Sequence, residues 1–385
     1  MMLQNKKIAI IGAGPGGLTL ARLLQMQGVD VKVYERDLDE TSRQQGATLD
    51  LHEGSGLEAL RRCNLMNEFS TNYRPDAGKL RLLDENANIH SDDHSEENTY
   101  SDSRPEIDRQ PLRDILYKSL KPNTVVWNSY FVEMEKQNDG WLIHFKNNIT
   151  IYADLVIAAD GANSKIRSYI TDIQPIYSGV TIVEGNIYNA KKNAPKLWEL
   201  VKGGKIFALG NEQTIILSTK GEGSLSFYTG CKDDENWTKT SGLDFNDKEQ
   251  ISKWFKTAFA TWSNVWQELF NSDEMWFLPR PQYHFPLDEH WESLPNLTML
   301  GDAAHRMPPY AGEGVNMAMQ DAFELAECLT SNKFENVHFA IKAFEKQMRK
   351  RASEITQDTL NNTALMHSEN GLQKLLDLFK QMREQ

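Results

Sequence analysis

IAIIGAGPGGLTLARLLQMQ, residues 8–27 of this 385-residue chain, is the stretch that decides the fold. Its first four residues are apolar and predict a buried strand, and the helical spacing of apolar residues from Leu18 to Gln27 predicts a helix. Between them, Gly12, Gly14 and Gly17 form the pattern GxGxxG. The first glycine permits a tight turn, the second lets backbone amides approach a pyrophosphate, and the third lets the helix pack closely on the strand. The stretch therefore predicts a dinucleotide held at a helix N-terminus.

An acidic residue ends the next predicted strand. Val29, Val31 and Val33 alternate as strand residues do, and Glu35 follows, 18 residues after Gly17. A carboxylate at this distance accepts hydrogen bonds from ribose hydroxyls. Strand, helix and strand in this order also predict a parallel sheet. With all these parts in register, a dinucleotide site is favoured over a fortuitous glycine turn.

Two further motifs follow predicted strands. Asp160-Gly161 comes directly after the apolar strand Leu155–Ala158. The second motif, GDAAHRMPPYAGEGVN over residues 301–316, follows the strand predicted at Asn296–Leu300. In it, a Pro-Pro pair stiffens the loop and glycines precede a helix predicted from Gly314 to Cys328. This arrangement predicts a second anion site, against the alternative of an ordinary strand-to-helix connection.

Composition excludes several classes of protein. The chain has 42 Lys and Arg against 54 Asp and Glu, a formal net charge of −12, which argues against a nucleic-acid partner. The mean hydropathy is −0.56, and no apolar run approaches the roughly 18 residues of a membrane span. Cys63, Cys231 and Cys328 lack metal-type or CxxC spacing, which suits a reducing cytoplasm. We therefore expect a cytoplasmic protein without a disulfide, a metal site or a membrane anchor.

Segments with different hydrophobic patterns alternate along the chain, which predicts interleaved domains. We expect an α/β fold, in which a Rossmann-like dinucleotide-binding domain carries an inserted, mainly antiparallel β-sheet domain and a C-terminal helix. The first domain is expected over 1–75, 105–172 and 286–335, and the inserted domain over 76–104 and 173–285. The inserted domain is expected to carry a Trp-rich helix over Asp247–Leu269, and residues 336–385 to form a bridging helix.

The three motifs together resemble the class A FAD-dependent aromatic monooxygenases, which have the para-hydroxybenzoate hydroxylase fold. The resemblance covers essentially the whole chain. Within this group, five stretches are similar to the tetracycline-inactivating flavin monooxygenases, the tetracycline destructases: Tyr34–Asp37, Gly46–Gly56, Glu106–Arg109, Leu112-Arg113 and His305–Tyr310.

The resemblance implies a set of cofactor contacts. For FAD they are Gly12, Gly14, Gly17, Glu35, Arg36, Asp50, Arg109, Arg113, Asp160, Asp302, Pro309, Gly312, Gly314 and Asn316. Arg43 stands at the position implied for NADPH, although a solvated loop arginine is an equal alternative. A surface ion pair with Asp108 or Glu106 is the alternative for Arg109, and a helix cap is the alternative for Asp302.

The substrate contacts follow less closely from the resemblance. Tetracycline destructases hydrogen-bond the drug through a glutamine, an arginine and a histidine, where this chain has Glu184, Lys205 and Ser226. Phe207, Ile216 and Phe227 are candidates for apolar contact, although each is also a candidate for the core. Pro309, Tyr310 and Gly312 are expected between flavin and substrate.

The resemblance implies a reaction without a protein nucleophile. With a single dinucleotide fingerprint, FAD is expected to stay bound while NADPH or NADH visits to reduce it. Addition of O₂ gives a C4a-hydroperoxyflavin, which hydroxylates a tetracycline-like polycyclic substrate and so inactivates the antibiotic. A hydroxylase of another phenolic or natural-product substrate is the alternative, and an FAD- and ligand-binding protein without turnover is a more remote one. The partner is a small aromatic or polycyclic molecule, and we expect a monomer.

Overall fold

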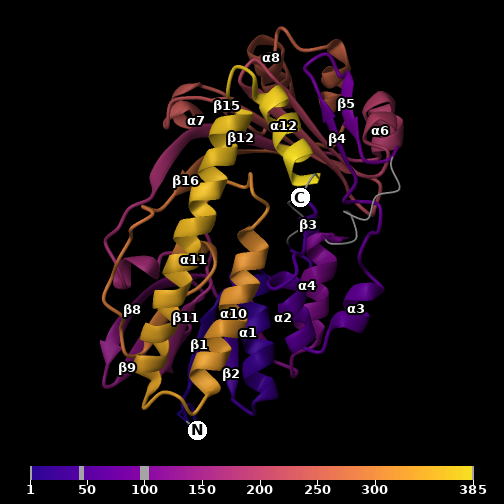
Figure 1. The fold of residues 1–385 in the computed structure, drawn as a ribbon. Helices are drawn as coiled ribbons and strands as arrows, with labels where there is room; N and C mark the ends of the chain where they lie inside the picture. Colours follow the sequence, from indigo (N-terminus) through magenta and orange to yellow (C-terminus); the bar gives the residue numbers. More distant parts are fainter. Residues whose placement is uncertain (1, 43–46, 96–103, 384–385) are drawn as a thin grey trace.

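A parallel sheet forms the lower half of the molecule (Figure 1). The computed structural model describes residues 2–42, 47–95 and 104–383. The strand order of this sheet is β17-β11-β1-β2-β7, and every neighbouring pair is parallel. Its strands are β1 (Ile8–Ile11), β2 (Val31–Tyr34), β7 (Val125–Val126), β11 (Leu155–Ala158) and β17 (Leu297–Met299). The expected α/β class with a Rossmann-like sheet is thus confirmed.

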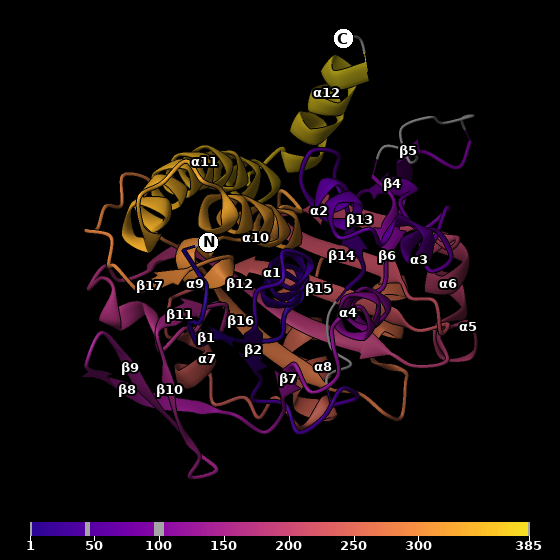
Figure 2. The same ribbon diagram turned by 90° about the horizontal axis from the view of Figure 1, so that it is seen from below.

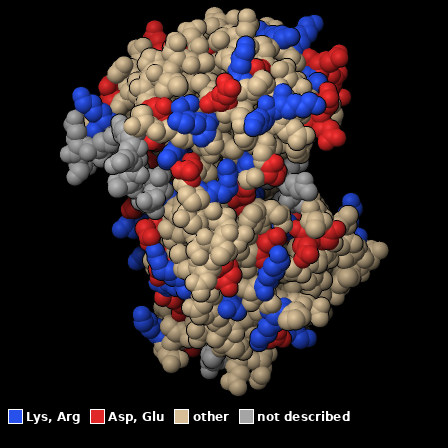
Figure 3. All heavy atoms as spheres, turned by 90° about the vertical axis from the view of Figure 1, so that its right-hand side faces the viewer, with Lys and Arg blue, Asp and Glu red and all other residues tan. Residues whose placement is uncertain are grey.

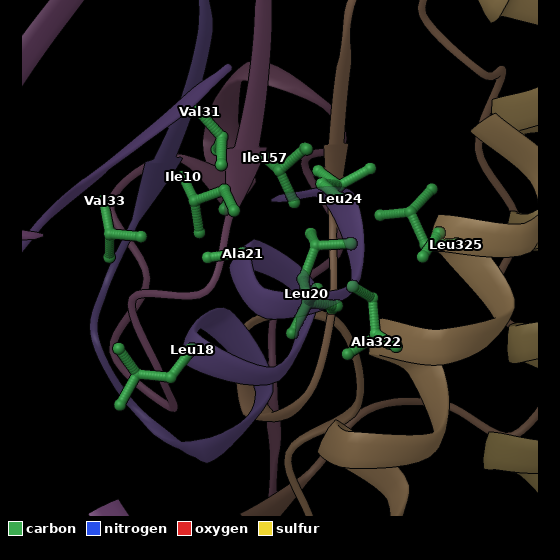
Figure 4. Packing of buried hydrophobic residues seen from close by; sticks show 14 of the residues in the cluster. Ile10, Leu18, Leu20, Ala21, Leu24, Val31, Val33, Ile157, Ala322 and Leu325 are labelled. Carbon is green, nitrogen blue, oxygen red and sulfur yellow. The ribbon is translucent and has the colours of Figure 1, made fainter. Parts of the chain in front are cut away.

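Apolar residues of the stretch 8–27 form the central strand of this sheet and part of the helical layer that covers it. All four residues of β1 and all four of β11 are buried, as strands covered on both faces must be. The first helix, α1 (Pro15–Met26), packs Leu20 and Leu24 between the sheet and Ala322 and Leu325 of α10 (Gly314–Thr330) (Figure 4). Figure 2 shows α1 lying between the sheet and α10. This packing holds the glycine loop and the start of α10 in fixed relation.

A second, larger sheet forms the upper half (Figure 1). Its strand order is β16-β12-β15-β14-β13-β4-β5, and all its pairs are antiparallel except β13 with β4. Its strands are β4 (Leu80–Leu83), β5 (Ile89–Asp92), β12 (Ile176–Ile187), β13 (Lys205–Gly210), β14 (Gln213–Thr219), β15 (Leu225–Lys232) and β16 (Phe277–His284). The acidic stretch after Asp84 begins as the β4–β5 hairpin, which extends this sheet.

Helices cover one face of the large sheet. They are α5 (Ala190–Asn193), α6 (Pro195–Val201), α7 (Trp237–Thr240), α8 (Lys248–Ala258) and the 3₁₀ helix η3 (Asn264–Phe270). Their apolar side chains form one core with Val183, Leu217 and Phe227 of the sheet. The predicted single helix over Asp247–Leu269 is wrong, because the chain turns after Ala258. A new 3₁₀ helix starts after Ser263, whose side chain caps it by accepting a hydrogen bond from Val265 N, and Trp262 and Trp266 are both buried in the core.

Smaller elements complete the fold. An antiparallel sheet flanks the parallel one, with β8 (Phe131–Gln137), β9 (Gly140–Phe145) and β10 (Thr150–Ala153). A two-stranded ladder joins β3 (Leu49–Asp50) to β6 (Glu106–Ile107). The remaining helices are α2 (Gly56–Arg62), α3 (Met66–Ser70), α4 (Arg109–Lys118), η2 (Arg167–Tyr169) and α9 (Asp302–His305). The ladder and α9 lie where the two halves of the molecule meet.

The C-terminal segment consists of two helices, which corrects the prediction of one bridging helix over 336–385. The long helix α11 (Val337–Met366) runs beside α10 from the parallel sheet toward the large sheet (Figures 1 and 2). After a turn, α12 (Gly371–Arg383) begins. Leu372, Leu375, Leu376 and Phe379 pack with Leu82 and Leu209 of the large sheet. The C-terminal segment therefore docks on the large sheet through the apolar side of α12.

The surface carries charges of both signs. On the face shown in Figure 3, acidic and basic side chains are interspersed over both halves of the molecule. Within the described ranges, no helix combines the length and the apolar composition needed to cross a bilayer.

Candidate functional site

The glycine loop between β1 and α1 forms a cradle that a side chain would fill. A Cβ on Gly12, whose φ is +114°, would lie 2.2 Å from the carbonyl oxygen of Ala159, and one on Gly17 would lie 2.1 Å from the carbonyl oxygen of Gly12. A Cβ on Gly14 would meet nothing within 4 Å. Gly14 is the N-cap of α1 and provides no side-chain cap. Two glycines thus close the turn, and the third leaves open space at the helix N-terminus, where a diphosphate fits.

Glu35 lies against this loop. Its Oε2 accepts a hydrogen bond from the backbone N–H of Ala13 at 2.6 Å, and its Oε1 accepts from Asp37 N at 3.0 Å. Arg113, from α4, donates to Asp37 Oδ2 at 3.0 Å and lies over the ring of Trp127. Arg113 Nη1 is buried and has no hydrogen-bond partner among the described residues. A buried donor of this kind suits an anionic ligand.

The second motif meets Asp50 and His52 at the start of α10. Asp302 begins α9 and is exposed, and a Cβ on Gly314 would lie 3.9 Å from its Oδ1. Gly312 has a φ of +71°, and a Cβ there would lie 3.2 Å from both carboxylate oxygens of Asp50. The Asn316 side chain accepts from His52 N at 2.9 Å and donates to the carbonyl oxygen of Asp50 at 2.9 Å. The structure therefore brings Asp302, Gly312, Gly314 and Asn316 of the second motif together with Asp50.

Other implied cofactor residues lie around this place. Asp160 accepts from Lys165 N at 3.0 Å, and burial raises the pKa of its carboxyl. Pro309 and Arg36 are exposed. Arg109 is exposed at the first position of α4, and neither alternative ion pair forms, because Asp108 pairs with Arg74 and Glu106 with Lys205. Arg43 lies outside the described residues.

A histidine bridges two carboxylates beside these motifs. His52 Nε2 lies 2.9 Å from Asp50 Oδ2, and its Nδ1 lies 3.0 Å from Glu313 Oε1. Burial opposes the charged imidazole, but the two hydrogen bonds outweigh it and raise the pKa of His52 to about 9. Burial likewise opposes ionisation of Asp50, but His52 and Lys205 lower the pKa of its carboxyl to about 2. His52 is therefore an imidazolium at neutral pH.

One face of the large sheet is turned toward these loops. Its strand register aligns one row of side chains on this face: Leu278, Glu184, Tyr228, Ile216, Phe207 and Leu82. The next row on the same face is Asn186, Ser226, Ser218, Lys205 and Leu80. The Tyr228 hydroxyl accepts a hydrogen bond from Ala47 N at 3.3 Å, which places this face against the cofactor loops. Burial, followed by the charge of Glu184, raises the pKa of Tyr228 to about 12.

The five sheet residues proposed for substrate contact share this face. Two are already paired, because Lys205 Nζ bonds Glu106 across the halves of the molecule and Arg280 Nε bonds Glu184 Oε2. Burial opposes the charge of Lys205, but Glu106 and Asp50 raise the pKa of its ammonium group. Phe227, by contrast, points to the opposite face and belongs to the helix-covered core. It is therefore not available for substrate contact.

Tyr310 lies between the second motif and the sheet. It packs with Phe207 and Ile216, and its hydroxyl lies 3.3 Å from Nε2 of His367 at the end of α11. Burial raises the pKa of Tyr310 and lowers that of His367 to about 4. On the other side of His367, a cleft of about 710 Å³ opens between α11 and the ends of β12 and β15.

Several residues of the site are not among those predicted from the sequence. His52 and Glu313 lie inside the quoted motifs, and a histidine flanked by Asp50 was the signal that could have found the first. Tyr228 lies two residues after Ser226 on one strand, so strand alternation predicts it on the same face as Ser226. Glu106 and His367 have no local signal, because their partners come from distant elements.

The chain matches a protein-family model described as "FAD binding domain" over residues 5–359. It is 26% identical to the protein named monooxygenase penA of Penicillium thymicola, over 96% of this chain and 97% of the relative. It is 27% identical to the 6-hydroxynicotinate 3-monooxygenase of Pseudomonas fluorescens, over 96% and 94%.

Solved structures agree in fold. A putative FAD-containing monooxygenase from Photorhabdus luminescens superposes with a TM-score of 0.75 and 26% identity, covering 93% of this chain and 98% of that one. The tetracycline destructase Tet(55) superposes with a TM-score of 0.74 and 19% identity, covering 94% and 90%.

Proposed function

Because this chain belongs to the FAD-binding domain family and is an FAD-dependent monooxygenase, we propose that it hydroxylates a small aromatic or polycyclic natural-product ring. NADPH or NADH and O₂ are the proposed co-substrates. The observation that carries the proposal is one face of the large sheet, on which Tyr228 bonds Ala47 and on which Phe207 and Ile216 pack with Tyr310 of the second motif. A flat ring fits between such a face and a flavin.

The residues present fit FAD. The uncapped start of α1 offers backbone N–H groups to the diphosphate, and the open space at Gly14 admits it. Glu35 stands at the ribose position, and the unpartnered Arg113 Nη1 is available to an anionic group. When bound, the flavin supplies the redox and oxygen chemistry. The chain's own residues bind and orient the two ligands, and Tyr310 with its apolar neighbours excludes water.

The remaining assignments are parts of this proposal. The domain ranges expected from the sequence, the FAD contacts and the five substrate contacts on the sheet are proposed on the geometry described above. Arg43 is proposed for NADPH on the resemblance alone.

Tetracycline is the second candidate substrate. The similarity of Gly46–Gly56 and His305–Tyr310 to the tetracycline destructases favours it. The differences at Glu184, Lys205 and Ser226 count against it, because Lys205 and Glu184 are each held by a protein partner. A site that hydrogen-bonds its ligand is sensitive to such changes. We therefore place other phenolic or natural-product rings first.

Turnover separates these candidates. Purified holoprotein is incubated with NADPH and O₂ plus either tetracycline or a set of phenols and heteroaromatic lactams. We expect ring-dependent NADPH oxidation with a mass gain of one oxygen in the ring compound. Oxygenation of tetracycline alone would reverse our order of candidates. NADPH oxidation without oxygen transfer to any compound would contradict the proposal.

A further inference from the structure

Glu184 is a buried carboxylate, and only one of its two oxygens has a hydrogen-bond partner among the described residues. It lies on β12 in the face turned toward the cofactor loops, and its side chain is 1% exposed. Its Oε2 accepts from Arg280, whereas its Oε1 is buried and has no hydrogen-bond partner among the described residues. A buried, unpaired acceptor costs free energy unless a ligand or water satisfies it. Glu184 Oε1 thus requires a hydrogen-bond donor from outside the described protein atoms.

Its neighbours on the face also have unmet hydrogen bonds. Asn186 lies two residues along the same strand, and Ser226 is its partner across the ladder. Asn186 Nδ2 and Ser226 Oγ are buried without a hydrogen-bond partner among the described residues. Phe207 and Ile216 continue the face as an apolar surface. Tyr228 lies between Glu184 and Ile216 in this row, and Tyr310 packs with Ile216 and Phe207, so the face has a hydrogen-bond acceptor and a donor beside an apolar part.

The charges of the face are already balanced. Arg280 compensates Glu184, and Lys205 compensates Glu106 while it also lies near Asp50. Lys205, the one cation in these two rows, is thus already paired, while Arg109, whose charge acts on Tyr228, lies outside them on α4. A carboxylate placed beside Glu184 would meet a like charge in a site of low dielectric, which is strongly unfavourable. A neutral donor, by contrast, satisfies Oε1 and leaves the charge balance unchanged.

We propose that Glu184 selects a neutral ring that presents an N–H or O–H donor, a lactam or a phenol, over a ring that carries a carboxylate. This inference rests on the proposed function, since it names the class of substrate for the same site. Glu184 is here a specificity residue, and Asn186 and Ser226 are positioned to bond the oxygen of the same lactam or phenol.

Three bicyclic probes of matched size test this selection. They are 2-naphthol, which is neutral with a donor, 2-methoxynaphthalene, which is neutral without one, and 2-naphthoate, which is an anion. Dissociation constants come from the change in absorbance of the bound flavin, so that no turnover is needed. We expect 2-naphthol to bind about tenfold or more tighter than either of the other two, the worth of one hydrogen bond to a charged group. Equal or tighter binding of 2-naphthoate, or no binding of 2-naphthol, would overturn the inference.

The variant Glu184→Gln tests the residue itself. Its amide oxygen can still accept from Arg280, but its NH₂ group turns the free edge from an acceptor into a donor. We expect the preference for 2-naphthol over 2-naphthoate to fall about tenfold, with flavin content unchanged. Glu199→Gln, the same change at an exposed position on α6, should leave the preference as it is. An unchanged preference in Glu184→Gln would refute the role of this side chain.

Failure of the inference is separable from failure of the proposed function. If the anionic probe binds best and rings are still oxygenated with NADPH and O₂, only the substrate class is wrong. If the probes bind in the expected order but no ring is ever oxygenated, the selectivity stands and the proposed function falls.

Discussion

Single residues decide whether the cofactor is accepted, and Gly14 shows this most directly. A Cβ at Gly14 meets no protein atom within 4 Å, and its φ of −75° suits any residue. We therefore expect Gly14→Val to fold normally and to lose bound FAD, because the side chain fills the space of the diphosphate. Flavin absorbance per protein and circular dichroism measure the two effects.

The contrasting change is Gly12→Val. There the Cβ would collide with the carbonyl of Ala159, so we expect loss of the fold itself. Full FAD content in Gly14→Val would contradict the placement of the cofactor.

His52 gives the site a dependence on pH. Its pKa is raised from 6.5 to about 9, so its ion pairs stabilise the fold fully below pH 6.5 and lose this effect as the pH rises through 9. At roughly 1.4 kcal/mol per pKa unit, the contribution is at most about 3.5 kcal/mol. Asp50, with its pKa lowered to about 2, stabilises above pH 3.8 and loses its effect only toward pH 2. Urea unfolding at pH 6, 7.5 and 9 measures the change.

The matched variant is His52→Gln, which retains a hydrogen-bonding side chain without a titrating charge. We expect its stability to vary less than that of the wild type between pH 6 and 9. Parallel curves for the two proteins would show that the bridge of Asp50, His52 and Glu313 does not control this range.

Among the elements, α12 depends on a small apolar contact. Leu375 is 6% exposed and packs with Leu82, Leu209 and Met366. We expect Leu375→Ala to lower the free energy of unfolding by about 2 kcal/mol, the low end for a buried leucine, and to make α12 the first segment cut by protease. Leu38→Ala, at a leucine that is 70% exposed, should change stability by less than about 0.5 kcal/mol. Equal effects at the two positions would refute the docking.

Local sequence patterns are enough to predict some helices and strands but not others. The parallel strands β1, β11 and β17 and the helices α1 and α10 follow from apolar runs and glycine positions near them in the sequence. The segment from Asp247 to Leu269 has helical composition throughout, yet only Lys248–Ala258 is α-helical. Its second half forms the separate 3₁₀ helix η3, which is capped by Ser263 and packs Trp266 into the core of the large sheet.

At the scale of the whole molecule, an ion pair joins the two halves. Lys205 on the large sheet bonds Glu106 on the β3–β6 ladder, and Glu106 is 2% exposed. We expect Lys205→Met to cost about 3 kcal/mol, because it leaves Glu106 as an uncompensated buried charge. Urea unfolding of this variant, of Glu106→Gln and of the double variant forms a complete cycle.

The double variant carries the test. We expect its loss of unfolding free energy to be smaller than the sum of the losses in the two single variants by at least about 1 kcal/mol. Strict additivity would show that the two side chains do not stabilise the junction together.

The dinucleotide fold, the glycine loop and the family can be predicted from the amino-acid sequence, because they depend on residues that are close along the chain. Strand, turn and helix at residues 8–27 specify their own geometry through glycine sterics and apolar periodicity. Only the tertiary structure decided what Glu184 and Lys205 contact, which face of the sheet Phe227 occupies, and that His52 bridges Asp50 and Glu313. These outcomes depend on strand register and on partners more than 90 residues apart, such as Lys205 and Glu106, which no local pattern encodes. Charge balance at the substrate face is therefore a property of the folded chain alone.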